Sequence, residues 1–186
     1  MANVQDVARF FIDYGEKSDE PMTNLRINKM LYFSQGMHLA KEGQPLFPNE
    51  IEAWPLGPVV ADIYHKYKPF ARKPIIDPEA GFYRDCFTES EYNSLLDAAR
   101  IYGVFTTSFL VGISHKTGGA WDVTMKATEK VIPNNLIKKE FSEKDSPVPF
   151  SIPYDKIMFI NTRDSNGMLV LSSEDDVDEW PEYDAV

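Results

Sequence analysis

The chain has 186 residues, of which 43% are hydrophobic and 26% are charged. This length and apolar content allow a substantial core, so a wholly disordered protein is excluded and one domain with appendages is expected. Lys and Arg number 19 against 29 Asp and Glu, and the resulting net charge of -10 opposes phosphate binding and favours a basic partner.

The cysteine content and the hydropathy pattern indicate the cellular compartment of the protein. Cys86 is the only cysteine, which excludes an internal disulfide and a cysteine-rich zinc site. The first residues lack the basic and apolar regions of a secretion signal, and no stretch reaches the roughly 18 apolar residues of a membrane span. We therefore expect a soluble, cytoplasmic protein without membrane contact.

Two helices are predicted in the first 43 residues. Asn3 can cap a helix that ends near Gly15. Thr23 begins the longest helix, which runs to about Glu42 and ends at Gly43. Its apolar residues are Leu25, Met30, Leu31, Phe33, Met37, Leu39 and Ala40. They cover more than one stripe, so this helix is expected at the centre of the core.

A proline-rich segment follows. We predict a loop with one short extended stretch, Ile51 to Trp54, which ends in a turn at Pro55 to Pro58. Pro58 suits the first position of a helix from Val59 to about Lys68.

The second half is predicted to contain three more helices and a hairpin. Thr88-Glu-Ser-Glu91 forms a capping box for a helix to about Tyr102. Thr106 or Thr107 begins the next helix, which ends at Gly118-Gly119, and a shorter one spans Pro133 to Phe141. Apolar runs at 156–160 and 168–172 flank Asp164-Ser-Asn-Gly, which is typical of a β-hairpin.

These elements predict an α+β fold that is predominantly helical. We expect a single compact helical domain with a small antiparallel sheet that includes the C-terminal β-hairpin, and residues 51–54 are a candidate further strand of this sheet. Residues 1–145 are expected to form the helical core, and residues 146–186 to add the hairpin and an acidic tail to the same domain.

The usual signatures of catalysis and metal binding are missing. His38, His65 and His115 are dispersed, and no pair has the spacing that places two ligands on one helix face. Cys86 has no recognisable base beside it, and neither a Gly-x-Ser-x-Gly elbow nor a phosphate loop occurs. We predict no catalytic residue, no cofactor and no enzyme, with a carboxylate pair in a cleft as the alternative.

The same residues have structural interpretations. His115 is expected to be buried and hydrogen-bonded near a helix end, where the dipole would favour its cation.

The one basic cluster offers a small surface for a nucleic-acid backbone. It consists of Lys66, Lys68, Arg72 and Lys73 with Tyr67 and Phe70 interleaved.

Two segments are candidates for protein binding. Trp180 and Tyr183 lie in the acidic stretch Glu174 to Asp184, which is either an interface anchor or a disordered solubilising end. Prolines on both sides of Gly57 preorganise the turn after Trp54, so binding through it would lose little entropy. The alternative is a helix-entry turn plugged into the core by Trp54.

Several segments together resemble a known family. They are Leu25 to Gly36 with Lys29-Met-Leu-Tyr-Phe at its heart, Leu46-Phe before Glu52-Ala-Trp, Gly57-Pro58-Val59-Val60 before Ile63-Tyr64, and Leu110 to His115 followed by Trp121. Their order and spacing resemble the Panacea domain, the SocA-like family of phage-associated and toxin-antitoxin proteins. The resemblance covers roughly residues 3 to 140 and departs from the family pattern at Pro55-Leu56 and in the loop Lys116 to Ala120.

The resemblance implies an antitoxin that neutralises a co-encoded toxin by direct binding. The alternatives are a proteolytic adaptor that delivers the toxin to a Clp-type protease and a DNA-binding regulator. The family-motif positions carried over are Lys29, Tyr32, Trp54, Gly57, Pro58, His115 and Trp121. The positions expected to contact the partner are Trp54, Leu56, Gly57, Pro58, Trp180 and Tyr183.

Overall fold

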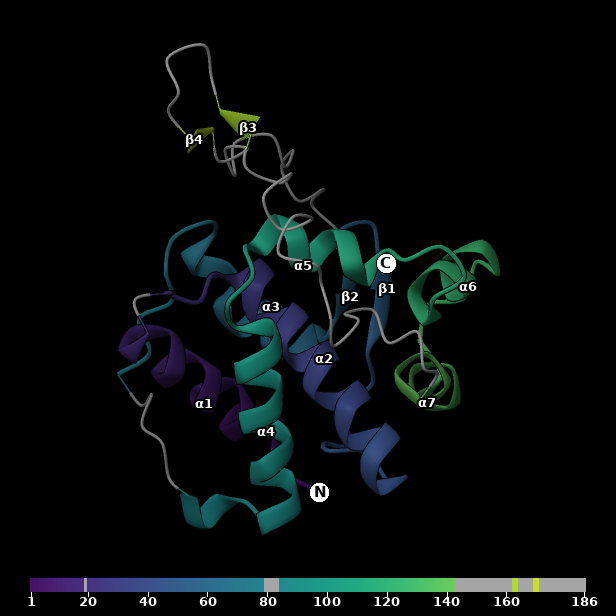
Figure 1. The fold of residues 1–186 in the computed structure, drawn as a ribbon, viewed down its shortest axis with the longest axis horizontal. Coiled ribbons are helices and arrows are strands. Elements are labelled where there is room, and N and C mark those ends of the chain that lie inside the picture. The colour runs from purple at the N-terminus through teal and green to yellow at the C-terminus, as the bar shows by residue number, and fades with distance from the viewer. Residues whose placement is uncertain (19, 79–83, 143–161, 164–168, 171–186) are drawn as a thin grey trace. The chain divides into compact units, whose positions relative to one another are not determined.

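The computed structural model describes residues 1–18, 20–78, 84–142, 162–163 and 169–170 (Figure 1). The chain divides into two units, Met1–Pro147 and Val148–Val186, which we describe separately. The described part of the first unit contains seven α-helices, two short 3-10 helices and one two-stranded sheet. The prediction of a predominantly helical fold is therefore confirmed, while the boundary at residue 145 and the single-domain assignment remain predictions.

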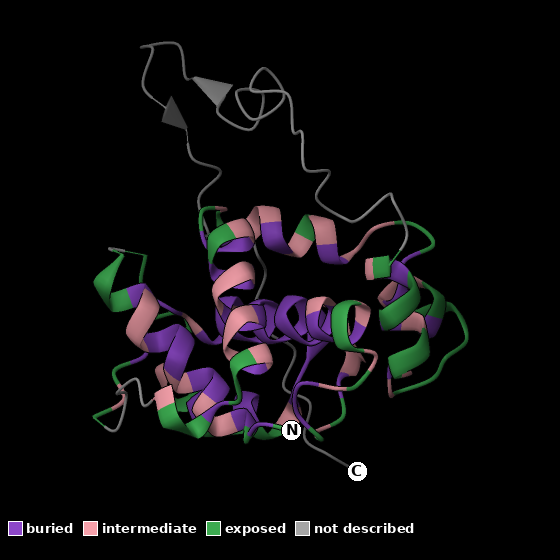
Figure 2. Cartoon of the chain, turned by 60° about the horizontal axis from the view of Figure 1, so that its bottom comes forward, coloured by how far each residue is buried: buried purple, intermediate pink, exposed green. Residues whose placement is uncertain are grey.

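The longest helix, α2 (Asn24–Glu42), lies at the centre of the first unit, as predicted. Helices α1 (Val4–Lys17), α4 (Glu89–Tyr102) and α7 (Asn134–Ser142) all pack against it (Figure 1). Most of α2 is buried around its whole circumference, as Figure 2 shows. Its surroundings explain why its apolar residues form more than one stripe.

The helix ends follow the local sequence signals. The Asn3 side chain accepts a hydrogen bond from the Gln5 N–H at 2.8 Å, and that of Thr23 accepts one from the Arg26 N–H at 3.2 Å. Gly43 ends α2 in the left-handed conformation with φ 75°. These caps confirm the predicted starts of α1 and α2 and the predicted end of α2.

Aromatic rings fill the space between α2, α4 and α7. The ring of Phe33 stacks on that of Tyr102 with a centroid distance of 4.1 Å, and the Phe141 ring meets Tyr32 edge-on at 5.6 Å. Gly36 makes this packing possible, because any Cβ there would overlap the Phe141 ring. A helical glycine is thus explained by a close approach between two helices.

The antiparallel sheet of the first unit lies in the middle of the chain, so the prediction that a C-terminal hairpin forms the small sheet of the helical domain is corrected. Strand β1 (Glu52–Trp54) pairs with β2 (Gly57–Val59) across a two-residue turn. Gly57 closes the turn with φ 101°, a value that favours glycine. The predicted extended stretch, β1, therefore pairs with the residues that directly follow the turn, β2.

Pro58 lies in β2, so the prediction that it begins a helix is wrong. It faces Ala53 next to the closing pair Trp54–Gly57, in a position whose N–H would not be needed by the ladder. The Ala53 N–H points the other way, to the Lys130 carbonyl at 2.7 Å. Helix α3 begins only at Ala61 and spans Ala61–Tyr67.

The remaining short elements complete the unit. A 3-10 turn at Lys68–Phe70 continues α3, and a second one spans Arg84–Cys86. Helix α5 (Thr107–Ser114) has the predicted cap at Thr106, whereas α6 (Ala120–Lys126) was not predicted. Its cap is Gly119, which has no side chain to mark a helix start.

The second unit is described only in two short strands. Strand β3 (Thr162–Arg163) pairs antiparallel with β4 (Leu169–Val170). The rest of the predicted hairpin and the acidic tail with Trp180 and Tyr183 lie outside the described residues.

No single helix in the described ranges is long and apolar enough to cross a membrane. Helices α4 and α5 together have the length and apolar composition of a span, but a bend of 109° lies between them.

The capping box of α4 gives a first test. The Glu91 N–H donates to Thr88 Oγ1 at 3.3 Å, and the Thr88 N–H donates to Glu91 Oε2 at 2.8 Å. Thr88→Ala should lower the free energy of unfolding by about 1 kcal/mol in urea titrations, because one partner of the box is lost. Thr117→Ala is the control, since Thr117 is exposed and makes no hydrogen bond in the described structure. Equal stabilities of the two variants would contradict the role of the box.

Candidate functional site

The family-motif residues converge on the β1–β2 turn from three helices and both strands. Lys29 and Tyr32 come from α2, His115 follows α5, and Trp121 lies in α6. Residues 54–58 supply the turn itself. Positions that span more than 90 residues of sequence thus form one connected group, which we call the turn cluster.

Lys29 supports the turn from within the core. Its side chain is 0% exposed, and its Nζ donates a hydrogen bond to the Pro58 carbonyl at 3.0 Å. Burial lowers the pKa of Lys29 from 10.5 to about 7, because a charge without water around it is unfavourable. The neighbouring Asn28 side chain accepts the Val60 N–H at 2.9 Å, so two consecutive residues of α2 fix the chain on either side of Val59.

Gly57 is required by space as well as by its backbone angle. A Cβ at this position would lie 2.7 Å from Lys29 Nζ and 3.0 Å from Ser114 Oγ. Ser114 is buried, and its hydroxyl donates to the Val111 carbonyl at 2.8 Å. The turn therefore rests directly on α2 and α5.

His115 and Trp121 hold the outer side of the turn. Trp121 Nε1 donates to the Trp54 carbonyl at 2.8 Å, and the ring of His115 meets the Trp121 ring edge-on at 3.9 Å. The two ring nitrogens of His115 lie 2.7 Å from the Val111 carbonyl and 3.3 Å from the Pro55 carbonyl. The Trp54 carbonyl is thus tied to α6, and the His115 ring packs against Trp121 beside the turn.

His115 is hydrogen-bonded at the end of α5, as predicted, but the expectation that the helix dipole favours its cation is wrong. The residue is half-buried, and burial lowers its pKa below 6.5, with nearby Lys29 acting in the same direction. The hydrogen bond to the Val111 carbonyl acts against this shift but is outweighed. A neutral ring can donate from one nitrogen only, and the shorter contact assigns that proton to Nδ1.

Tyr32 connects the cluster to α7. Its hydroxyl donates to Glu140 Oε2 at 2.8 Å, and the same oxygen accepts the Ala120 N–H at 2.6 Å. Burial and the neighbouring Glu140 carboxylate raise the pKa of Tyr32 well above 10.0, so the phenol stays protonated as a donor. One carboxylate therefore links α2, α6 and α7 and fixes the start of the helix that carries Trp121.

Part of the turn faces solvent. Pro55 is exposed, and Trp54, Leu56 and Trp121 are half-buried. The Trp54 ring meets Tyr64 edge-on at 4.8 Å, and its Nε1 donates to Glu52 Oε2 at 2.7 Å. Trp54 therefore packs on the core through Tyr64 and, being half-buried, also forms part of a surface with the Pro55-Leu56 tip, so the two interpretations of the turn are compatible.

The other candidate residues do not join this cluster. Lys68, Arg72 and Lys73 are exposed, and Lys66 forms an ion pair with Asp77 at 3.3 Å. No group of three His, Cys, Asp or Glu side chains in the described ranges could hold a metal ion.

Sequence reasoning missed Ser114, Glu140 and α6. One signal for Glu140 was present: it is a carboxylate on the same helix face as Ile137, three positions earlier, which is fully buried. A charged residue on an apolar helix face predicts a buried polar partner. The residue that would be that partner, Tyr32, could not be identified from spacing, because the two are 108 positions apart.

The turn cluster and its helices correspond to a known family. Residues 27–122 match the family model described as antitoxin SocA-like, Panacea domain. This range spans more than half of the chain and includes all seven motif positions, so the chain belongs to the SocA-like Panacea family.

One relative with the name of an antitoxin is similar to this chain in sequence. The antitoxin SocA of Caulobacter vibrioides (strain NA1000 / CB15N) is 32% identical over 129 residues, which cover 63% of this chain and 67% of that protein. No solved structure matches the chain. The predicted family resemblance is therefore confirmed by sequence comparison.

The buried amine of Lys29 predicts a pH dependence of stability. Between about pH 7 and 10.5 the lysine is protonated in the unfolded chain but neutral in the folded protein. The unfolded state then binds more protons, so stability rises with pH by up to about 1.4 kcal/mol per unit. Lys29→Met removes this titration. Urea unfolding at pH 7, 8 and 9 should show a stability difference, wild type minus variant, that grows with pH, whereas parallel curves would contradict a buried neutral amine.

Gly57 and Gly118 form a matched pair for a second test. Both have positive φ, at 101° and 78°, but a Cβ at Gly118 would have no atom within 4 Å. Gly118→Ala should therefore show backbone strain alone, about 1 kcal/mol. Gly57→Ala should cost about 2 kcal/mol more, because Lys29 Nζ must leave the Pro58 carbonyl. Equal losses in thermal unfolding would show that Lys29 does not fix the turn.

Proposed function

We propose that this chain is the antitoxin of a toxin-antitoxin system and neutralises a co-encoded protein toxin by direct binding. The observation that carries the proposal is the Panacea family match over residues 27–122, together with the relative that bears the name antitoxin. The chain would act in stoichiometric amounts and without catalysis, by covering the substrate-binding face of the toxin.

The β1–β2 turn is the proposed contact surface. Its backbone is held by Lys29, Asn28 and Trp121, so little conformational freedom remains to be lost when a partner binds. Its exposed tip combines Pro55 and Leu56 with the edge of Trp54, and aromatic side chains of this kind are favoured anchors at interfaces. Trp180 and Tyr183 remain candidate contacts from the acidic tail.

The charge of the chain suggests the chemistry of the toxin. A net charge of -10 would accelerate the approach of a basic protein and repel an acidic one. We therefore propose a basic toxin, such as an enzyme whose positive face binds a phosphate-containing substrate. The same charge disfavours the alternative of a DNA-binding regulator.

Co-expression with the neighbouring reading frame tests the proposal. A small open reading frame that is toxic alone should become harmless beside this chain, and the two products should co-purify. Leu56→Glu should weaken their binding by about 2 kcal/mol, roughly 30-fold in Kd, because it places a charge at the centre of the turn surface. Val104→Glu is the control, since Val104 is 69% exposed and lies outside the turn cluster.

The outcome separates the proposal from its alternatives. Co-purification without rescue, or equal losses in both variants with unchanged thermal stability, would rule out neutralisation through the turn. Rescue that disappears in a strain without Clp proteases would assign the adaptor role instead. Binding of the chain to its own promoter, weakening steeply between two salt concentrations, would favour the regulator.

A further inference from the structure

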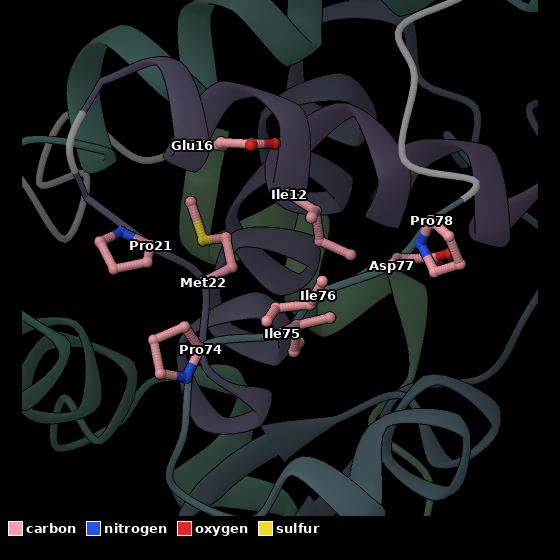
Figure 3. A pocket seen from close by; sticks show the side chains of 9 residues that line it. All are labelled: Ile12, Glu16, Pro21, Met22, Pro74, Ile75, Ile76, Asp77 and Pro78. Carbon is pink, nitrogen blue, oxygen red and sulfur yellow. The ribbon is translucent and has the colours of Figure 1, made fainter.

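A pocket of about 370 Å³ lies away from the turn cluster, between the C-terminal half of α1 and the segment after the first 3-10 turn. Its lining residues are Ile12, Glu16, Pro21, Met22, Pro74, Ile75, Ile76, Asp77 and Pro78. None of the seven motif positions is among them. Figure 3 shows Pro21 and Pro74 at one end and Asp77 and Pro78 at the other.

The pocket has an apolar floor and an exposed apolar wall. Ile12, Met22 and Ile75 are nearly inaccessible to solvent and form the floor. Ile76 is 77% exposed, the highest value of any exposed large hydrophobic side chain in the described structure. An apolar side chain of a partner that covered Ile76 would remove the exposed surface of Ile76 from water, whereas the floor is already almost fully shielded.

The walls are fixed before any partner binds. The Ile75 N–H donates to the Met22 carbonyl at 2.8 Å, which joins the two chain segments that flank the floor. The Tyr67 hydroxyl donates to Asp77 Oδ2 at 2.7 Å and anchors the far end. Three prolines restrict the remaining backbone freedom, so a ligand would enter a preformed site.

The charges of the lining residues are all negative. Glu16 is exposed and has no ion pair in the described structure, although its neighbours Asp13 and Lys17 pair with each other at 2.7 Å. Asp77 is the second carboxylate, but it already forms an ion pair with Lys66 at 3.3 Å, so Glu16 is the carboxylate that a further cation would reach. None of the lining residues is basic. A ligand with an apolar stem and a positively charged end would therefore complement both the apolar floor and the carboxylate of this pocket.

We propose that this pocket binds a lysine or arginine side chain of a protein partner, together with an apolar residue beside it. The methylene stem would lie on Ile12, Met22 and Ile75, and the cationic end would reach the carboxylate of Glu16. The neighbouring apolar residue would cover Ile76. The site is separate from the turn surface, so it stands whether or not the turn binds a toxin.

Methyl NMR of the full chain tests the proposal with two blocked peptides, acetyl-Gly-Leu-Lys-Leu-Gly-amide and the same peptide with Glu in place of Lys. The lysine peptide should cause saturable shifts of the Ile12, Met22 and Ile76 methyl groups with a Kd on the order of 1 mM. The glutamate peptide should bind at least about fivefold more weakly. The absence of saturable shifts, or equal binding of both peptides, would overturn the proposal.

Two exposed positions provide variants with matched controls. Glu16→Gln should weaken the lysine peptide about threefold, and Glu129→Gln, a distant exposed carboxylate, should not. Ile76→Ser should weaken both peptides, whereas Val104→Ser removes a similarly exposed apolar side chain elsewhere and should have no effect. Binding that is unchanged in Glu16→Gln and Ile76→Ser, or reduced equally in the controls, would assign the shifts to another surface.

Discussion

The structure depends on a buried amine. Lys29 lies in the most enclosed helix of the described structure, where burying a lysine is costly, and its amine donates to the carbonyl of Pro58. The amine is buried where α2 meets the β1–β2 turn. Gly57 has no Cβ there, which leaves space for Lys29 Nζ. The position of the turn, and with it everything that the turn presents to solvent, therefore follows from one side chain inside the core.

The motif residues and the exposed tip of the turn have different roles. Lys29, Gly57 and Pro58 are buried, and Trp121 holds the Trp54 carbonyl from outside. Pro55 and Leu56 form the tip of the turn, which solvent reaches. The residues that fix the turn are therefore largely separate from those that a partner could reach.

The parts of the fold that could be predicted were those with local signals. Thr23, Gly43 and the Thr88 capping box marked helix ends within a few residues, and the all-round apolar pattern placed α2 in the core. Pro58 misled the prediction, because a proline at a helix start and a proline in a non-hydrogen-bonded strand position look alike in sequence. The motif positions were found from their resemblance to a family, whereas Glu140 and Ser114 act through partners far away in sequence. The exposure of Trp54 depends on tertiary packing and could not be predicted from the residue type.

The link between Tyr32 and Glu140 has a consequence for synthesis of the protein. The two residues are 108 positions apart, so the N-terminal half of the chain leaves the ribosome long before α7 exists. Until then the face of α2 that carries Tyr32 and Gly36 has no cover, and its apolar surface is open to aggregation or to a chaperone. Closing so long a loop is also slow, because the entropy of a large segment is lost before the contact forms. The packing of α7 against α2 therefore cannot form before residues 134–142 have left the ribosome.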